Sequence, residues 1–164
     1  SWSIWAFLSI LNALSYREMS GNWIMTLQFF TGSIACLFTF LRTLFIGKFV
    51  LPKKWYEWSV FVLCITALVY WKLKDATGAN YIVVLAFMVS FIPTFVGVLH
   101  DPFKETPRSW VLWTIAFLIT IINIILLKGK FSVYIAPSLL LIAHFSIVLL
   151  SSKKRKRSFA KVFK

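Results

Sequence analysis

Long apolar runs separated by short polar breaks restrict what this sequence can fold into. Six such runs follow one another along the chain, over residues 1–16, 23–45, 58–71, 80–99, 110–127 and 131–150. A helix of about 20 apolar residues crosses a bilayer. Hydrophobic residues make up 60% of the 164 residues and charged residues only 14%, which is too little polar surface for a soluble domain of this size. We therefore predict an all-α fold, a polytopic membrane helix bundle with six visible spans.

The first run is short for a span. From Ser1 to about Tyr16, a helix would rise only about 24 Å, against about 30 Å for the hydrocarbon core of a bilayer. The run also starts without a methionine and without the charge pattern of a signal peptide. We therefore expect the natural chain to begin earlier, with a further helix ahead of Ser1.

An internal repeat relates two of the runs. Residues 1–5 read SWSIW, and residues 109–113 read SWVLW, 108 positions later. The same shift carries Trp23 onto Phe131, and each of these residues begins the next apolar run. The sequence therefore uses one pair of hydrophobic helices twice, as membrane proteins built from repeated helical units do.

The repeat predicts two units joined by a linker. The second tryptophan-bearing helix follows a helix that contains Pro93, so a complete unit would have three helices, of which the first half shows two. A three-helix unit ends on the opposite side of the membrane from where it began, so one extra helix lets the second unit enter in the same orientation. We predict residues 1–46 as the first unit, 47–79 as a linker helix with its loops, 80–150 as the second unit and 151–164 as a basic tail.

Basic residues gather on one side of the predicted bundle. Of the 18 lysines and arginines, 13 fall on the side of the C-terminus, seven of them in the tail, and 5 fall on the other side. By the positive-inside rule the tail is cytoplasmic, and its charges suit anionic lipid headgroups. We therefore assign the formal charge of +13 to a membrane surface and not to nucleic acid.

Several short motifs in the second half carry a family resemblance. Residues 90–94 read SFIPT, residues 101–106 read DPFKET, and residues 136–138 read APS. Together with the three-one-three helix plan, these motifs resemble the SWEET and PQ-loop superfamily of sugar transporters, in particular bacterial SWEET-like proteins of uncharacterised function. The resemblance implies a protein of the bacterial plasma membrane that moves a small neutral solute, such as a sugar, by alternating access of its two units.

The resemblance also implies where a solute would bind. In SWEET transporters, tryptophans of the middle helices stack on the sugar ring, which corresponds here to Trp5 and Trp113, one turn deeper than the first tryptophan of each pentad. Polar residues of the third helices hydrogen-bond to the sugar, and the positions that hold asparagine in the family hold Cys36 and His144 here. His144 is the one ionisable side chain well inside a run; it either faces a cavity or is neutral and bonded to a backbone carbonyl.

Other polar residues and prolines inside the runs have two interpretations each. Gln28 and Asn123 either help to bind a solute or hydrogen-bond between helices, and the same choice holds for Asn12. Pro93 and Pro137 free backbone carbonyls, and they either act as hinges between moving units or shape the packing of a static bundle.

The sequence lacks the patterns of catalytic and metal sites. No carboxylate lies within an apolar run, so we expect facilitated diffusion without coupling to protons or sodium. No nucleophile–base constellation, glycine-rich phosphate loop or metal-ligand spacing occurs, so we predict no enzyme activity, no cofactor and no metal. The alternative function is a non-transporting scaffold or subunit of a membrane complex. Whether the chain forms a homo-oligomer stays open.

Overall fold

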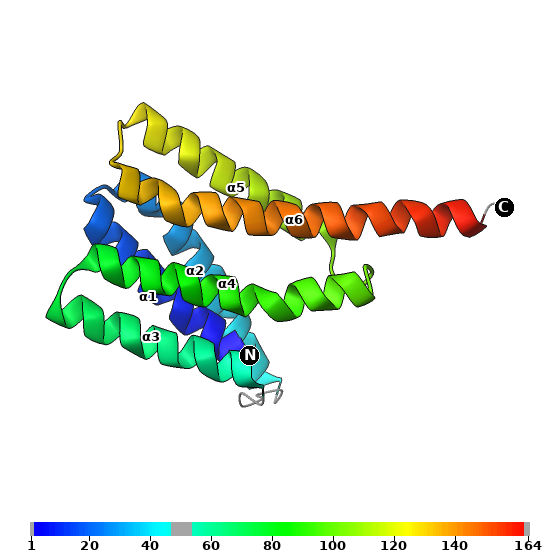
Figure 1. Cartoon of the computed structure of the whole chain (residues 1–164), viewed down its shortest axis with the longest axis horizontal. Coiled ribbons are helices and arrows are strands. Elements are labelled where there is room, and N and C mark those ends of the chain that lie inside the picture. Colours follow the sequence, from blue (N-terminus) through cyan, green and yellow to red (C-terminus); the bar gives the residue numbers. More distant parts are fainter. Residues whose placement is uncertain (1, 47–53, 163–164) are drawn as a thin grey trace.

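The computed structural model describes residues 2–46 and 54–162, except for the side chains of Trp2 and of residues 153–162. Over these residues the chain is helical and contains no strand, so the all-α prediction is confirmed (Figure 1). The helices are α1 (Trp2–Ser20), α2 (Trp23–Phe45), α3 (Trp55–Leu73), α4 (Ala76–His100), α5 (Pro107–Leu126) and α6 (Phe131–Val162).

Among the described residues, five helices, α2 to α6, are long and apolar enough to cross a membrane. Their outer faces expose large apolar side chains, among them Leu27, Phe38 and Leu112. Exposed apolar surface of this extent is unfavourable in water and suits lipid. The chain therefore has the helices of a membrane-embedded protein.

Six spans are predicted, and the one that is not among these five helices is the first, α1. Polar residues lower its hydropathy. It lies inside the bundle, in contact with α2, α3, α4 and α6. Leu8, Leu11 and Tyr16 are buried on it, and so are the polar side chains of Ser9 and Asn12. Polar side chains are tolerated at these positions because they face neighbouring helices and not lipid.

The break between α1 and α2 is shorter than the predicted break over residues 17–22. The first helix continues to Ser20, and Gly21 then adopts a φ of 66°, a left-handed conformation that ends a helix readily only at glycine. The Asn22 side chain accepts a hydrogen bond of 2.8 Å from the N–H of Ile24 and so caps the start of α2.

Several other predicted boundaries shift toward longer helices, among them the start of α4 and the end of α6. The Asp75 side chain accepts a hydrogen bond of 2.7 Å from the N–H of Gly78, so α4 begins at Ala76 and not at the predicted Asn80. The backbone of α6 stays helical to Val162, beyond the predicted end of the second unit at residue 150. As far as Val162, the predicted basic tail therefore continues α6 as a helix.

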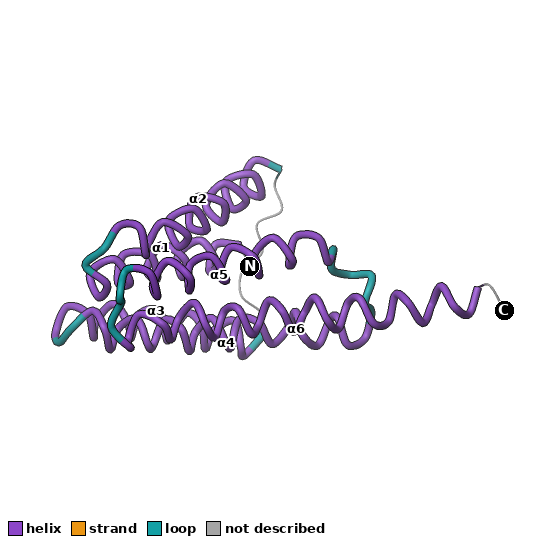
Figure 2. Tube along the Cα trace, turned by 90° about the horizontal axis from the view of Figure 1, so that it is seen from above, coloured by secondary structure: helices purple, strands orange, loops and turns teal. Residues whose placement is uncertain are grey.

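Consecutive helices pack as hairpins, α1 with α2, α3 with α4 and α5 with α6. Further contacts join α1 to α3, α4 and α6, join α4 to α6 and join α2 to α5. Figure 2 shows two layers, with α3, α4 and α6 in one and α1, α2 and α5 in the other. The first two helices therefore pack directly against the helices of the second predicted unit.

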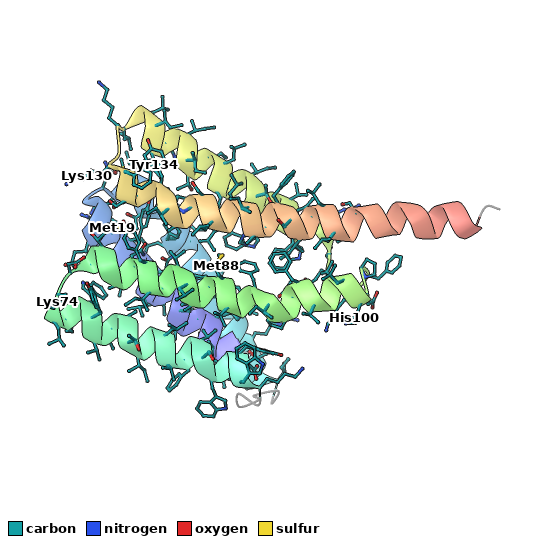
Figure 3. All side chains as sticks on the ribbon, viewed as in Figure 1. Met19, Lys74, Met88, His100, Lys130 and Tyr134 are labelled. Carbon is teal, nitrogen blue, oxygen red and sulfur yellow. The ribbon has the colours of Figure 1, made fainter. Side chains whose placement is uncertain are left out.

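The loops that the structure describes lie at two ends of the bundle. Met19, Lys74 and Lys130 lie at one end, here named the hairpin end, and His100 lies at the other (Figure 3). The C-terminal part of α6 extends past the bundle on the side of His100, so this end is named the tail end (Figure 1). This division agrees with the predicted alternation of loops along the chain.

Candidate functional site

A partly open cavity of about 520 Å³ lies between α1, α2, α4, α5 and α6. Its aromatic lining residues are Trp5, Phe29, Phe87, Trp110, Trp113 and Phe117. Its polar lining residues are Ser9, Asn12, Gln28, Cys36, Thr39, Thr94, Glu105 and His144. Cavities of this size, with mainly apolar walls and a few polar groups, are typical of small-molecule sites.

Five of the six residues predicted to bind a solute line this one cavity: Trp5, Gln28, Cys36, Trp113 and His144. They come from four helices, α1, α2, α5 and α6. Trp5 and Trp113 stand 108 positions apart, and so do Cys36 and His144. Both pairs that the predicted repeat relates therefore line the same cavity, and their part in binding stays a prediction.

The sixth predicted residue, Asn123, is not part of the cavity wall. It lies in the last turn of α5, where its backbone carbonyl accepts a hydrogen bond of 2.9 Å from the N–H of Leu127. Trp110, expected to lie nearer the interface than Trp113, does line the cavity. The side chain of Trp2 lies outside the described residues.

His144 is buried among aromatic rings. The centroid of its ring lies 5.0 Å from that of Phe91, 5.1 Å from Phe117, 5.3 Å from Trp110 and 6.1 Å from Trp113. Its Nδ1 lies 2.6 Å from the carbonyl oxygen of Leu140. A carbonyl only accepts, so Nδ1 carries a proton, and in the neutral ring Nε2 is left as an acceptor. Both predicted environments of His144, a cavity and a backbone carbonyl, therefore occur together.

Each of the two predicted stacking tryptophans is held by neighbouring rings. Trp5 meets Phe87 and Phe91 edge to face, with centroids 5.7 Å and 5.5 Å apart. Trp113 stacks on Phe117 at 6.3 Å. Its indole also reaches α2 at Gly32, where a Cβ atom would lie 3.3 Å from the indole Cη2. Such contacts restrict how far either indole can turn away from the cavity.

Pro137, one of the two predicted hinges, leaves one carbonyl of α6 free. A proline cannot donate to the carbonyl four residues earlier, which here belongs to Val133. The buried Tyr16 hydroxyl donates to this carbonyl at 2.6 Å and so joins α1 to α6. The Tyr16 ring packs against Phe29, a residue of the cavity wall, with centroids 4.3 Å apart. The other proline, Pro93, likewise lies inside a continuous helix, α4.

Glu105 is a lining residue that the apolar runs do not predict. It belongs to the loop between α4 and α5, and its Oε2 accepts a hydrogen bond of 3.0 Å from Trp110 Nε1. An acid is therefore present at the cavity although none lies within an apolar run. The one signal in the sequence is its position five residues before Trp110, which alone does not distinguish it from an exposed loop residue.

Asn80 takes part in the cavity wall indirectly. Its Nδ2 donates to Asn12 Oδ1 at 2.9 Å and to Ser15 Oγ at 3.1 Å, so a polar link joins α4 to α1. A hydrogen bond between helices is one of the two predicted interpretations of Asn12, and Asn80 is its partner. Asn80 stands at the predicted edge of a run, a position that does not indicate burial.

Comparison with known proteins gives no relative. No family model, curated protein or solved structure matches the chain. What the cavity can do therefore follows from its own residues. Flat indole faces suit the apolar side of a ring, and the imidazole, amide and hydroxyl groups around them can exchange hydrogen bonds with a neutral polar molecule.

Proposed function

We propose that this chain is a membrane facilitator that moves a small neutral solute, such as a sugar, by alternating access between two related helical units. The observation that carries the proposal is the meeting of Trp5 with Trp113, and of Cys36 with His144, around one cavity. When both units contribute to one binding space, rocking one unit against the other changes the side to which that space opens.

The pattern of helix contacts supports the same relation between the units. Under the 108-residue shift, α1 and α2 correspond to α5 and α6. The contact of α2 with α5 then corresponds to the contact of α6 with α1, and both contacts exist. Such an exchange is expected for two parallel units related by an axis along the membrane normal.

The class of solute follows from the lining and from the family resemblance. Two indole faces and an imidazole acceptor suit a ring that bears hydroxyl groups. The motifs at residues 90–94 and 101–106 resemble SWEET-like proteins, which favours a sugar. A scaffold subunit would need neither a polar cavity nor lining from both units.

Orientation is part of the proposal. The 13 basic residues on the side of the tail favour a cytoplasmic tail end by the positive-inside rule. We take the cavity to be reached from the cytoplasmic side, because Glu105 of the α4–α5 loop, at the tail end, is one of its lining residues. In sealed cells, an impermeant thiol reagent is expected to label Lys74→Cys from outside and Ser152→Cys only after permeabilisation. The reverse pattern would overturn this orientation.

Thermal stability with and without solutes tests the proposed function. The natural full-length protein in detergent would be heated with a panel of neutral sugars and other small polar solutes. A solute that binds only the folded protein raises its apparent stability, by about 2.7 kcal/mol at 100 times its Kd. We expect a shift with at least one solute that disappears in Trp113→Leu and persists in Trp58→Leu, a control on the exposed face of α3. No shift with any member would count against transport.

A further inference from the structure

A buried pair of amides lies at one wall of the cavity. Asn12 of α1 lines the cavity, and Asn80 of α4, next to it, is fully buried. Asn80 Nδ2 donates to Asn12 Oδ1 at 2.9 Å and to Ser15 Oγ at 3.1 Å. Asn80 Oδ1 is buried and has no partner among the described residues. The hydrogen bonds of the Asn80 side chain are therefore all donated by its nitrogen.

The hydrogen bonds fix the direction of both amides. The Ser15 hydroxyl donates its one proton to the backbone carbonyl of Asn12 at 3.3 Å, so its oxygen is an acceptor toward Asn80. If the Asn80 amide were turned round, its two N–H groups would be buried without acceptors. That arrangement costs more than one buried oxygen without a donor, because two groups lose their hydrogen bonds. The Asn80 nitrogen is therefore the donor, and the Asn12 oxygen is its acceptor.

The remaining polar group of Asn12 is its side-chain nitrogen. Its oxygen is engaged by Asn80, whereas its Nδ2 makes no hydrogen bond within the described part of the chain and belongs to a side chain of the cavity wall. We propose that Asn12 Nδ2 donates a hydrogen bond to the transported solute, and that Asn80 is the positioning residue that keeps this nitrogen turned toward the cavity. The inference rests on the proposed transport function.

The proposed donor on α1 complements the acceptor on α6. Asn12 requires an acceptor on the solute, and His144 Nε2 requires a donor. A hydroxyl group meets both requirements, whereas an ether oxygen only accepts and an ammonium group only donates. The pair of residues therefore selects a neutral molecule with several hydroxyl groups over an organic cation of the same size.

The first test needs no solute. With Cys36 and Cys64 replaced by alanine, Asn12→Cys is expected to react with a small water-soluble thiosulfonate, and Asn80→Cys is expected to stay unreactive. Cys36 in the natural chain is the positive control, because it lines the same cavity. An unreactive Asn12→Cys beside a reactive Cys36 would overturn the proposal.

The second test uses D-glucose with its monodeoxy and monofluoro analogues, taken up by proteoliposomes that contain the natural full-length protein. A fluorine accepts but cannot donate, whereas a deoxy position does neither. At one ring position, we expect the wild type to take up the fluoro sugar and to take up the deoxy sugar about tenfold less well. A tenfold change corresponds to the free energy of about one hydrogen bond.

Two isosteric substitutions should abolish this preference. Asn12→Asp removes the N–H groups themselves. Asn80→Leu does not touch the solute, but it removes the N–H group that donates to Asn12 Oδ1, so the Asn12 nitrogen is no longer held toward the cavity. Ser15→Ala is the matched control, because Asn80 keeps Asn12 Oδ1 as its acceptor, and the wild-type preference should persist.

The outcomes separate this proposal from the transport function. If the wild type takes up glucose and either Asn12→Asp or Asn80→Leu keeps the wild-type preference, the assignment of Asn12 and Asn80 is wrong and transport stands. A purely structural role would lower uptake of all analogues equally and would also overturn it. If the wild type takes up no member of the series, the sugar-transport function fails, and the present proposal fails with it.

Discussion

The Tyr16 hydroxyl donates to the Val133 carbonyl the hydrogen bond that Pro137, which has no N–H group, cannot donate. Their hydrogen bond, 2.6 Å long, joins α1 to α6 near the hairpin end of the cavity. The α5–α6 turn packs tightly in the same region, where a Cβ at Gly129 would lie 2.6 Å from Ile124 Cγ2 and 2.9 Å from Val133 Cγ2. Under the proposed alternating-access cycle, we expect this bond to break when the cavity opens to the hairpin end.

Tyr16→Phe leaves the Val133 carbonyl without a partner. A buried acceptor without its hydrogen bond costs about 1–3 kcal/mol, so the apparent melting temperature in detergent is expected to fall. The hairpin end should also open more often, which would speed the modification of Cys36 by an impermeant thiol reagent from that side. Tyr81→Phe, on an exposed face of α4, is the control and should change neither quantity. Unchanged stability and labelling in Tyr16→Phe would show that this bond does not hold the end closed.

Gly32→Ala should disturb the site without unfolding the bundle. The added Cβ would lie 3.3 Å from Trp113 Cη2, so the indole must move by a few tenths of an ångström. We expect solute affinity to fall about fivefold, equivalent to about 1 kcal/mol, while stability is kept because alanine favours a helix over glycine. Gly97→Ala is the matched control, since its Cβ would meet only the flexible side chain of Lys104. Equal solute affinity in the two variants, measured by thermal shift, would mean that Gly32 does not position Trp113.

Substitutions at Glu105 test whether transport requires the negative charge of this side chain. Glutamine at this position can still accept the hydrogen bond from Trp110 Nε1, so Glu105→Gln is expected to keep near wild-type uptake under facilitated diffusion. Glu105→Ala leaves the indole N–H without this partner and should lower uptake severalfold. Uptake into proteoliposomes with and without a proton gradient measures both effects. Loss of uptake in the glutamine variant would indicate proton coupling instead.

Apolar periodicity predicts the helices of this fold better than their ends. The bounds of α2 agree with the predicted run, because Gly21 and Asn22 stop one helix and cap the next. The start of α4 at Ala76 depends on a capping aspartate that lies outside the apolar run. The extension of α6 follows from lysine and arginine, which are polar but favour helix, so the end of an apolar run is not the end of the helix.

The spacing of the repeat predicts which helix faces meet, but it does not predict the residues that depend on loops or on register between helices. Trp5, Trp113, Cys36 and His144, which the predicted repeat pairs, do line one cavity. Asn123 has the right chemistry but lies too near the end of α5. Glu105 reaches the cavity through the path of the α4–α5 loop, and a pattern of apolar runs contains no information on that path.

Uptake of a labelled neutral sugar by proteoliposomes tests the central claim most directly. The natural full-length protein would be reconstituted without proton or sodium gradients, beside the double variant Trp113→Leu/His144→Leu and the control Trp58→Leu. A facilitator is expected to bring the internal sugar to the external concentration and no further. The double variant should fail to do so while remaining folded, and the control should behave as the wild type. Absence of uptake by the wild type, or full uptake by the double variant, would contradict the function and the site proposed for this cavity.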